Sequence, residues 1–153
     1  MRRSIAVMTL VVFAWTHAFA AQRFSWNKVR YQGGTVQVKV DPWDWNTTIT
    51  VKPDVITLLF SPKATVVIPP AKVVSVSYGQ QAKRRVEDVV ALSMLLGPLG
   101  LFGLMHKTKD ELVGIVYDTG DGKQGAVLLE SPFALAIAGA LSGVTGKPVE
   151  VKP

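Results

Sequence analysis

The chain has 153 residues, of which 48% are hydrophobic and 18% charged, so it is long enough for one domain with a packed core and too apolar for a disordered chain. It contains no cysteine, which excludes disulfides, thiolate metal sites and a cysteine nucleophile. Its formal net charge of +6 suits an anionic membrane surface at least as well as nucleic acid.

The first twenty residues have the pattern of a secretory signal peptide. Met1-Arg2-Arg3 is a short basic segment, Ile5 to Phe19 is apolar, and Ala18-Phe19-Ala20 places small residues before a cleavage point. We therefore predict a signal peptide over 1–20 and a single exported domain over 21–153, located in the periplasm, the cell envelope or the extracellular space. An uncleaved N-terminal membrane anchor is the alternative for this segment. Export argues against nucleic acid as a partner.

Short apolar runs separated by turn residues follow the signal. The runs that we predict to be strands are 29–31, 35–40, 48–51, 55–60, 65–68, 72–78, 111–118 and 124–130. The run from Thr35 to Val40 alternates most clearly, with Val36, Val38 and Val40 on one face, and Gly33-Gly34 separates it from the run before. Because 29–31 and 35–40 are counted as one interrupted strand, the total is about seven.

One amphipathic helix is predicted near the C-terminus. Ser131-Pro132 has the pattern of a helix start, Phe133 to Leu141 carries an apolar stripe, and Gly143 and Gly146 mark the end. About seven antiparallel strands followed by one helix predict a mainly β fold, in which a curled sheet or small barrel has the helix over one open end.

This order of elements resembles the pleckstrin-homology (PH)-like superfold, including its GRAM branch and the small bacterial exported PH-like domains. The segment from Val66 to Tyr78 (VVIPPAKVVSVSY) is similar to a strand–turn–strand often seen in those domains, and the resemblance spans roughly Val29 to Lys147. It implies a seven-stranded antiparallel PH-like barrel that acts as a binding or scaffold module, and it carries over no catalytic residue. Lys39, Lys52 and Lys63 are too scattered to match a phosphoinositide-binding motif.

The uncharged stretch from Val89 to Met105 departs from the PH-like pattern, which has only a loop between its fifth and sixth strands. Basic residues flank the stretch on both sides, and Gly97-Pro98 at its midpoint favours a reversal. We predict an apolar helical hairpin over 81–106 that dips into one leaflet of a membrane. Burial in a homo-oligomer or a partner's groove, and burial in the domain's own core, are the alternatives.

This prediction assigns two sets of residues. The residues predicted to insert into a membrane or partner are Val89, Val90, Leu92, Met94, Leu95, Leu96, Leu99, Leu101, Phe102, Leu104 and Met105. The residues predicted to face lipid headgroups are Lys83, Arg84, Arg85, Lys107 and Lys109. Trp43 and Trp45 share a face if the loop is extended, and they are either interfacial anchors, part of a ligand surface or, as we favour, ordinary core or turn packing.

The predicted mature domain has few residues that are suited to catalysis. His106 has no cysteine partner and no evident set of carboxylates, which supports neither a triad nor a zinc site. Asp118 and Asp121 fit a hairpin turn better than a calcium loop. We therefore predict no enzyme activity, no metal and no cofactor. The predicted function is that of an exported, non-catalytic binding or scaffold module on a membrane surface, and the alternative is a soluble exported protein whose apolar segment is buried in an oligomer or a partner interface.

Overall fold

The computed structural model describes residues 22–41, 43–60, 64–94 and 111–151, with side chains of the first helix described as far as Leu92. The predicted signal peptide over 1–20 therefore lies outside the described residues. The elements in chain order are β1 (Phe24–Gly34), β2 (Thr47–Val51), β3 (Ile56–Phe60), β4 (Ala64–Ile68), the 3-10 helix η1 (Pro70–Lys72), β5 (Val73–Tyr78), α2 (Gln80–Met94), β6 (Leu112–Asp118), β7 (Gln124–Glu130), α3 (Ala134–Thr145) and β8 (Val149–Glu150).

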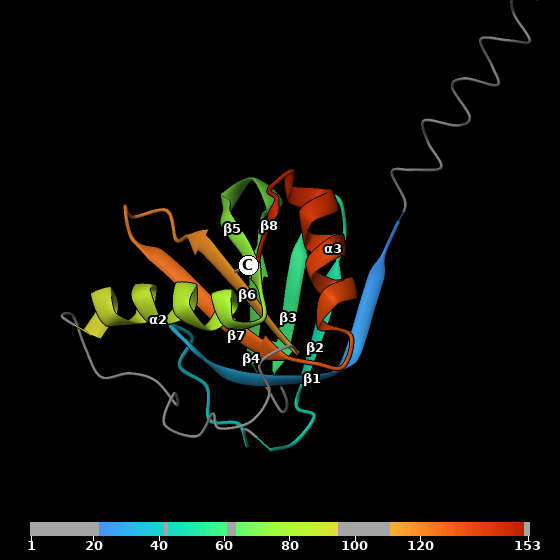
Figure 1. Ribbon diagram of the computed structural model, residues 1–153, viewed down its shortest axis with the longest axis horizontal. Helices are drawn as coiled ribbons and strands as arrows, with labels where there is room; N and C mark the ends of the chain where they lie inside the picture. Colours follow the sequence, from blue (N-terminus) through green and yellow to red (C-terminus); the bar gives the residue numbers. More distant parts are fainter. Residues whose placement is uncertain (1–21, 42, 61–63, 95–110, 152–153) are drawn as a thin grey trace, which may run out of the picture.

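The strands form one curled sheet in the order β4-β3-β2-β1-β7-β6-β5-β8 (Figure 1). Neighbouring strands are antiparallel except β5 and β8, which are parallel. The predicted mainly β fold with a C-terminal helix is confirmed. The sheet differs from the predicted seven-stranded antiparallel barrel, because in the described ranges it has eight strands, mixed directions and open edges at β4 and β8.

The long strand β1 joins the two halves of the sheet. Its first part pairs with β2, where Phe24 faces Val51, and its second part pairs with β7, where Arg30 faces Glu130. The register shifts twice along β1, and Gly33 and Gly34 have φ angles of 150° and 147°. A Cβ at Gly34 would lie 2.1 Å from the carbonyl oxygen of Ala126, so only glycine allows this approach.

Two sequence predictions for this region are corrected. Gly33-Gly34 continues β1 instead of breaking it, because glycine permits the bulged, closely packed backbone there. Residues 35–40 form no strand, although Val36, Val38 and Val40 pack half-buried against the core while Gln37 and Lys39 are exposed. Alternation reports which side of a chain is buried, and it does so whether or not a neighbouring strand supplies hydrogen bonds.

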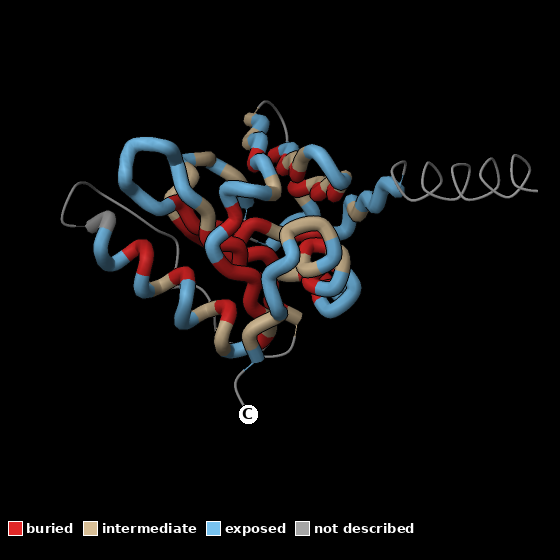
Figure 2. The backbone as a smooth tube through the Cα atoms, turned by 90° about the horizontal axis from the view of Figure 1, so that it is seen from above, coloured by how far each residue is buried: buried red, intermediate tan, exposed pale blue. Residues whose placement is uncertain are grey.

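The strands β6 and β7 are buried on both faces. On the inner face, Val113, Ile115, Val127 and Leu129 belong to the main core, which the two halves of the sheet and α3 enclose. On the outer face, Leu112, Val116, Ala126 and Leu128 form a second core with α2. Figure 2 shows the buried segments gathered at the centre, with the exposed turns of the helices facing away from them. Burial on both faces explains why these strands read as nearly unbroken apolar runs.

The two helices cover different faces. α3 places Ile137, Ala138 and Leu141 in the main core and ends at Gly146, whose φ of 70° is left-handed. At the start of α3, the Ser131 hydroxyl accepts the Phe133 N–H at 3.1 Å and donates to the Lys28 carbonyl at 2.8 Å. α2 lies across the outer face of β6 and β7 (Figure 1). The helix that the sequence predicts as the start of an insertion is thus a cover for the sheet.

The close approach of α2 to β6 requires glycine at position 114. A Cβ there would lie 2.8 Å from the Ser77 hydroxyl oxygen and 3.1 Å from the backbone oxygen of Ala82. We expect Gly114→Val to lower the free energy of unfolding by about 1–3 kcal/mol, because the added atoms force α2 away from the sheet. Chemical denaturation followed by circular dichroism measures this change.

Gly139→Ala is the matched control for this substitution. Gly139 lies in α3, and a Cβ added there would have no neighbouring atom within 4 Å, so the free energy of unfolding should stay unchanged or rise by up to about 1 kcal/mol. A Gly114→Val variant as stable as the parent would show that α2 does not pack on β6 in this way.

Candidate functional site

One side of α2 is buried in the second core. Ala82, Val86, Val89 and Val90 are buried and pack on the outer face of β6 and β7. Their spacing of four, three and one residues places them on one side of a helix. Val89 and Val90 are therefore inside the domain and cannot insert into a membrane or a partner in this structure, which corrects the prediction for these two residues.

The apolar sequence continues beyond the end of this stripe. Leu92, the last described side chain of α2, is 67% exposed, and Ala91 is exposed beside it. The first part of the predicted insertion, 81–94, is thus a helix that lies along the sheet. The remaining residues predicted to insert or to face headgroups lie outside the described side chains, and they are Met94, Leu95, Leu96, Leu99, Leu101, Phe102, Leu104, Met105, Lys107 and Lys109.

The two described ends of segment 95–110 are well separated. β6 begins beside the first residues of α2, because the Gly79 N–H donates to the Leu112 carbonyl at 2.9 Å. α2 then runs for 15 residues away from that point, which at 1.5 Å per residue is about 20 Å. The last described residue before segment 95–110 is therefore at the far end of α2, and the first described residues after it are near the helix start.

Two of the three described basic residues predicted to face headgroups have acidic partners in the chain. Lys83 lies 3.6 Å from Glu87 on α2. The Arg85 guanidinium donates two hydrogen bonds to Glu150 of β8, at 2.6 and 2.9 Å, and this pairing raises the pKa of Arg85. Arg84 is exposed and has no ion pair among the described side chains. Arg85 thus fastens the C-terminal strand to α2, and Arg84 is the cation that remains available.

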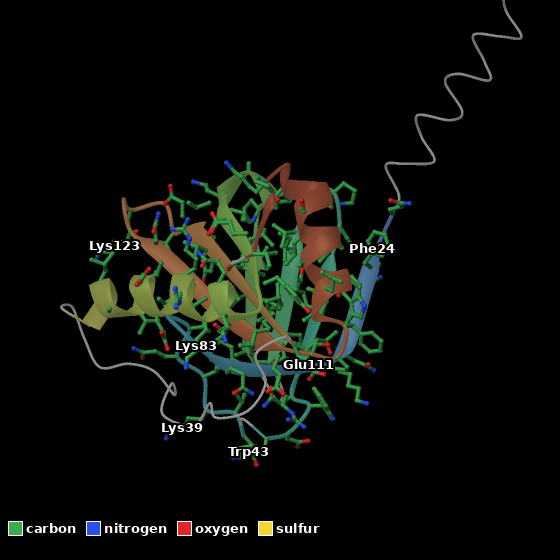
Figure 3. The ribbon with its side chains drawn as sticks, in the orientation of Figure 1. Phe24, Lys39, Trp43, Lys83, Glu111 and Lys123 are labelled. Carbon is green, nitrogen blue, oxygen red and sulfur yellow. The ribbon has the colours of Figure 1, made fainter. Side chains whose placement is uncertain are left out.

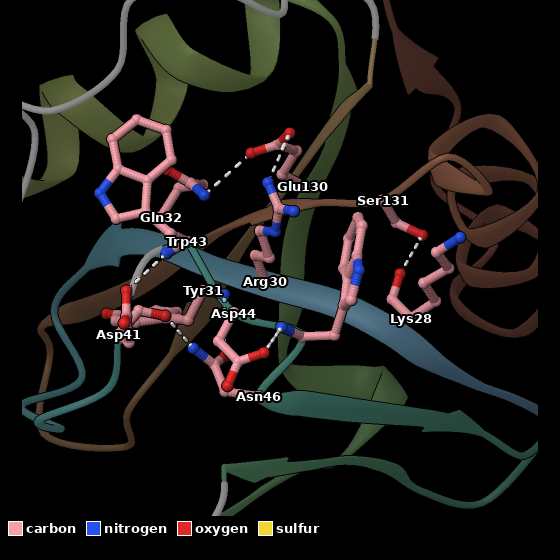
Figure 4. A network of polar contacts seen from close by, with 11 residues as sticks. Lys28, Arg30, Tyr31, Gln32, Asp41, Trp43, Asp44, Asn46, Glu130 and Ser131 are labelled. Atoms are coloured by element: carbon pink, nitrogen blue, oxygen red, sulfur yellow. Dashed lines mark hydrogen bonds and ion pairs between the residues drawn. The ribbon is translucent and has the colours of Figure 1, made fainter.

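A short loop carrying two tryptophans contacts β1 through Trp45, whose ring lies over Arg30. Asp41 Oδ1 accepts the Trp43 N–H at 2.9 Å, and Asp44 Oδ1 accepts the Trp45 N–H at 2.9 Å (Figure 4). The Asn46 amide donates to the Asp41 carbonyl and closes the loop. These local bonds are the turn chemistry expected of Asp and Asn.

The two tryptophans have different environments. The Trp45 ring stacks on the Arg30 guanidinium, 3.9 Å from its centroid, with the Lys28 ammonium 5.4 Å away. Trp43 is 66% exposed, and Figure 3 shows it with Lys39 at the lower side of the molecule. The favoured sequence interpretation, turn packing, fits Trp45, whereas Trp43 presents its ring to the surroundings.

Arg30, Gln32 and Glu130 form a polar cluster that the sequence did not reveal. Arg30 lies 3.7 Å from Glu130, and the Gln32 amide donates to Glu130 at 2.9 Å (Figure 4). Arg30 and Gln32 flank Tyr31, and Glu130 follows Leu129, so all three face away from the main core. The cluster shares the outer face with α2. In the sequence, only the alternation within 29–32 indicates that Arg30 and Gln32 face outward. This run is too short to show that their partner is Glu130, almost a hundred residues away.

Asp118 and Asp121 accept hydrogen bonds from backbone N–H groups of their own turn. Asp118 Oδ1 accepts the Gly120 N–H at 2.7 Å, and Asp121 Oδ1 accepts the Lys123 N–H at 3.2 Å. The hydrogen bond from the Thr119 hydroxyl, and after it the one from the Lys123 N–H, lowers the pKa of Asp121. Within the described ranges, no three His, Cys, Asp or Glu residues converge as a metal site would require. His106 and Asp110 lie outside those ranges.

No protein-family model matches this sequence, and no curated protein matches it. In the part of the chain that the structure describes, none of the helices has the length and apolar character needed to cross a membrane. The candidate site is therefore defined by geometry alone. It consists of the exposed residues Ala91 and Leu92 at the end of α2 and of the loop 41–46 beside Arg30. We call these residues the outer surface, as distinct from the buried outer face of β6 and β7.

The difference between the two tryptophans can be measured. We expect Trp43→Ala to change the free energy of unfolding by less than about 0.5 kcal/mol, because an exposed ring contributes little to folding. Trp45→Ala should cost about 1 kcal/mol or more, because it removes the stacking on Arg30 and the loop packing. Urea denaturation of both variants tests this, and equal costs would contradict the described loop.

Proposed function

We propose that this protein is an exported, non-catalytic binding or scaffold module that associates with a membrane surface through its outer surface. The observation that carries the proposal is the exposed Leu92 at the point where the core stripe of α2 ends. The sequence beyond it stays free of charge as far as Met105. Apolar side chains in such a position gain free energy when they leave water, at about 1.5–3 kcal/mol for each leucine fully buried.

The tryptophan loop supports the same orientation. Trp43 is exposed, its neighbour Trp45 lies over the outward-facing Arg30, and tryptophan is favoured at the level of lipid headgroups because its ring is apolar and its N–H is polar. Two separate segments of the chain thus present apolar groups on one side. A shallow insertion of about 5–10 Å is typical of proteins that lie on a membrane without crossing it.

The charge of the exported domain favours an anionic surface. Without Arg2 and Arg3 the formal charge is 15 basic minus 11 acidic residues, or +4. Lys28, Lys39 and Arg84 are exposed cations that the described ion pairs leave available. Each basic residue near an anionic surface contributes about 1 kcal/mol, so binding should weaken as salt concentration rises.

A PH-like scaffold is part of this proposal. The order of seven strands, the main core enclosed between the two halves of the sheet, and the helix α3 after β7 support it. The eighth strand and the outer helix α2 are additions to that pattern. In this scheme the PH-like part holds the surface rigid, and the outer helix supplies the attachment.

Vesicle binding by matched leucine variants tests the proposal. Leu92 is 67% exposed on α2, and Leu135 is 64% exposed on α3, so neither supports the core. We expect Leu92→Ser to weaken binding to vesicles of phosphatidylglycerol and phosphatidylcholine about tenfold, because about 1.5 kcal/mol of apolar transfer is lost. Leu135→Ser should bind like the parent. Co-sedimentation of the chain lacking residues 1–20 measures both.

The parent protein and Leu92→Ser also separate the alternative function. If the apolar segment is buried in an oligomer or a partner interface, the parent protein will not sediment with vesicles. Leu92→Ser will then change the molar mass in solution instead of the bound fraction. That result would contradict membrane association as the function of the outer surface.

A further inference from the structure

The loop 41–46 is attached to β1 at two places. The Tyr31 N–H donates a hydrogen bond to Asn46 Oδ1 at 3.4 Å, which is a long contact for this kind of bond. The Trp45 ring lies over the Arg30 guanidinium, with 3.9 Å between the guanidinium carbon and the ring centroid. A cation this close to the face of a tryptophan is attracted to the ring, so the stacking is the stronger of the two attachments.

The Arg30 side chain is held in place by β7. Its guanidinium lies 3.7 Å from the Glu130 carboxylate, and the two side chains are only 22% and 14% exposed (Figure 4). The Gln32 amide donates to the same carboxylate at 2.9 Å, which fixes Glu130 as well. Arg30 Nε is buried without a hydrogen-bond acceptor among the described residues, so the face of the Trp45 ring is the electrostatic partner on hand for this group.

Trp43 depends on this support for its orientation. Its N–H bonds within the loop, to Asp41 Oδ1 at 2.9 Å, and its ring is 66% exposed. In the described structure no hydrogen bond, ion pair or ring contact joins Trp43 to Arg30. An influence of Arg30 on Trp43 must therefore pass through Trp45 and the loop. A loop that is ordered before it binds loses less conformational entropy on binding, so such support strengthens attachment.

We propose that Arg30 is a positioning residue, which is held by Glu130, fixes Trp45 and thereby orients Trp43 toward lipid headgroups. The inference rests on the proposed membrane function. It deepens that function by extending the attachment site from an exposed loop to two side chains of the sheet. Neither Arg30 nor Glu130 has to touch lipid, because their effect passes through Trp45.

A double-mutant cycle between Arg30 and Trp43 tests the proposal by co-sedimentation with vesicles of phosphatidylglycerol and phosphatidylcholine. Lys39→Gln removes one exposed cation and controls for charge, so it should weaken binding about fivefold. Arg30→Gln should weaken binding about twentyfold, because it removes the same charge and also the support of the loop. In the Trp43→Ala background, Arg30→Gln should cost only about fivefold, since no Trp43 is left to orient.

Two results of the cycle would overturn the proposal. The first is a loss for Arg30→Gln no larger than that for Lys39→Gln, which would leave charge as the whole effect. The second is the same loss for Arg30→Gln with and without Trp43, which would mean that Arg30 does not act through that ring.

Hydrogen exchange without vesicles tests the positioning by itself. Arg30→Gln should speed exchange of the Trp43 and Trp45 amides at least about fivefold and leave β6 and β7 unchanged, whereas Lys39→Gln should change neither. Unchanged exchange at both amides would overturn the proposal. A parent protein that does not bind vesicles would contradict the proposed function instead, and the exchange result would still decide the positioning. Should Arg30→Gln fail to fold, Trp45→Ala replaces it in both experiments with the same expected pattern, because it removes the ring and leaves the ion pair of Arg30 with Glu130.

Discussion

The strands β6 and β7 are apolar on both faces, and both faces must be covered. The main core and α3 cover the inner face, and α2 covers the outer one. Gly114 lets the backbone of α2 come close to β6, and the hydrogen bond from Gly79 to Leu112 fixes the start of the helix beside the start of that strand. This requirement decides where α2 lies and which of its residues are used.

The same constraint defines what remains outside. The stripe from Ala82 to Val90 is long enough to cover the outer face, and the apolar sequence does not stop there. Leu92 belongs to the apolar sequence that continues beyond this stripe, and it is exposed. Packing on β6 and β7 thus uses one part of the long apolar region, and Leu92 lies outside that contact.

The sheet could largely be predicted from the sequence. The predicted run 124–130 coincides with β7, and the runs for β2 to β6 differ by one residue at most at each end, because turn residues and alternation mark them clearly. The start of β1 and the continuation through Gly33-Gly34 could not be predicted, because the bulges depend on where β2 and β7 lie. The eighth strand, Val149–Glu150, has only two residues and a parallel partner, so it leaves no local pattern from which it could be predicted.

The candidate site was harder to predict for a related reason. The buried stripe of α2 consists of Ala82, Val86, Val89 and Val90, and apolar residues follow it directly in the sequence. No local pattern therefore shows where the buried residues end. The sequence assigns Arg85 to headgroups because its partner, Glu150, is 65 residues away. Trp43 and Trp45 are equivalent in sequence, and only the position of Arg30 under one ring separates them.

Hydrogen exchange with and without anionic vesicles tests the central claim, that α2 is divided between the core and a membrane surface. Without vesicles, the amides of 82–90 should already be protected by packing on β6 and β7. With vesicles, exchange should slow across 91–110 and in the loop 41–46, and stay the same in β3 and β4. Unprotected amides over 82–90, or vesicle-bound protein with unchanged exchange over 91–110, would contradict this division.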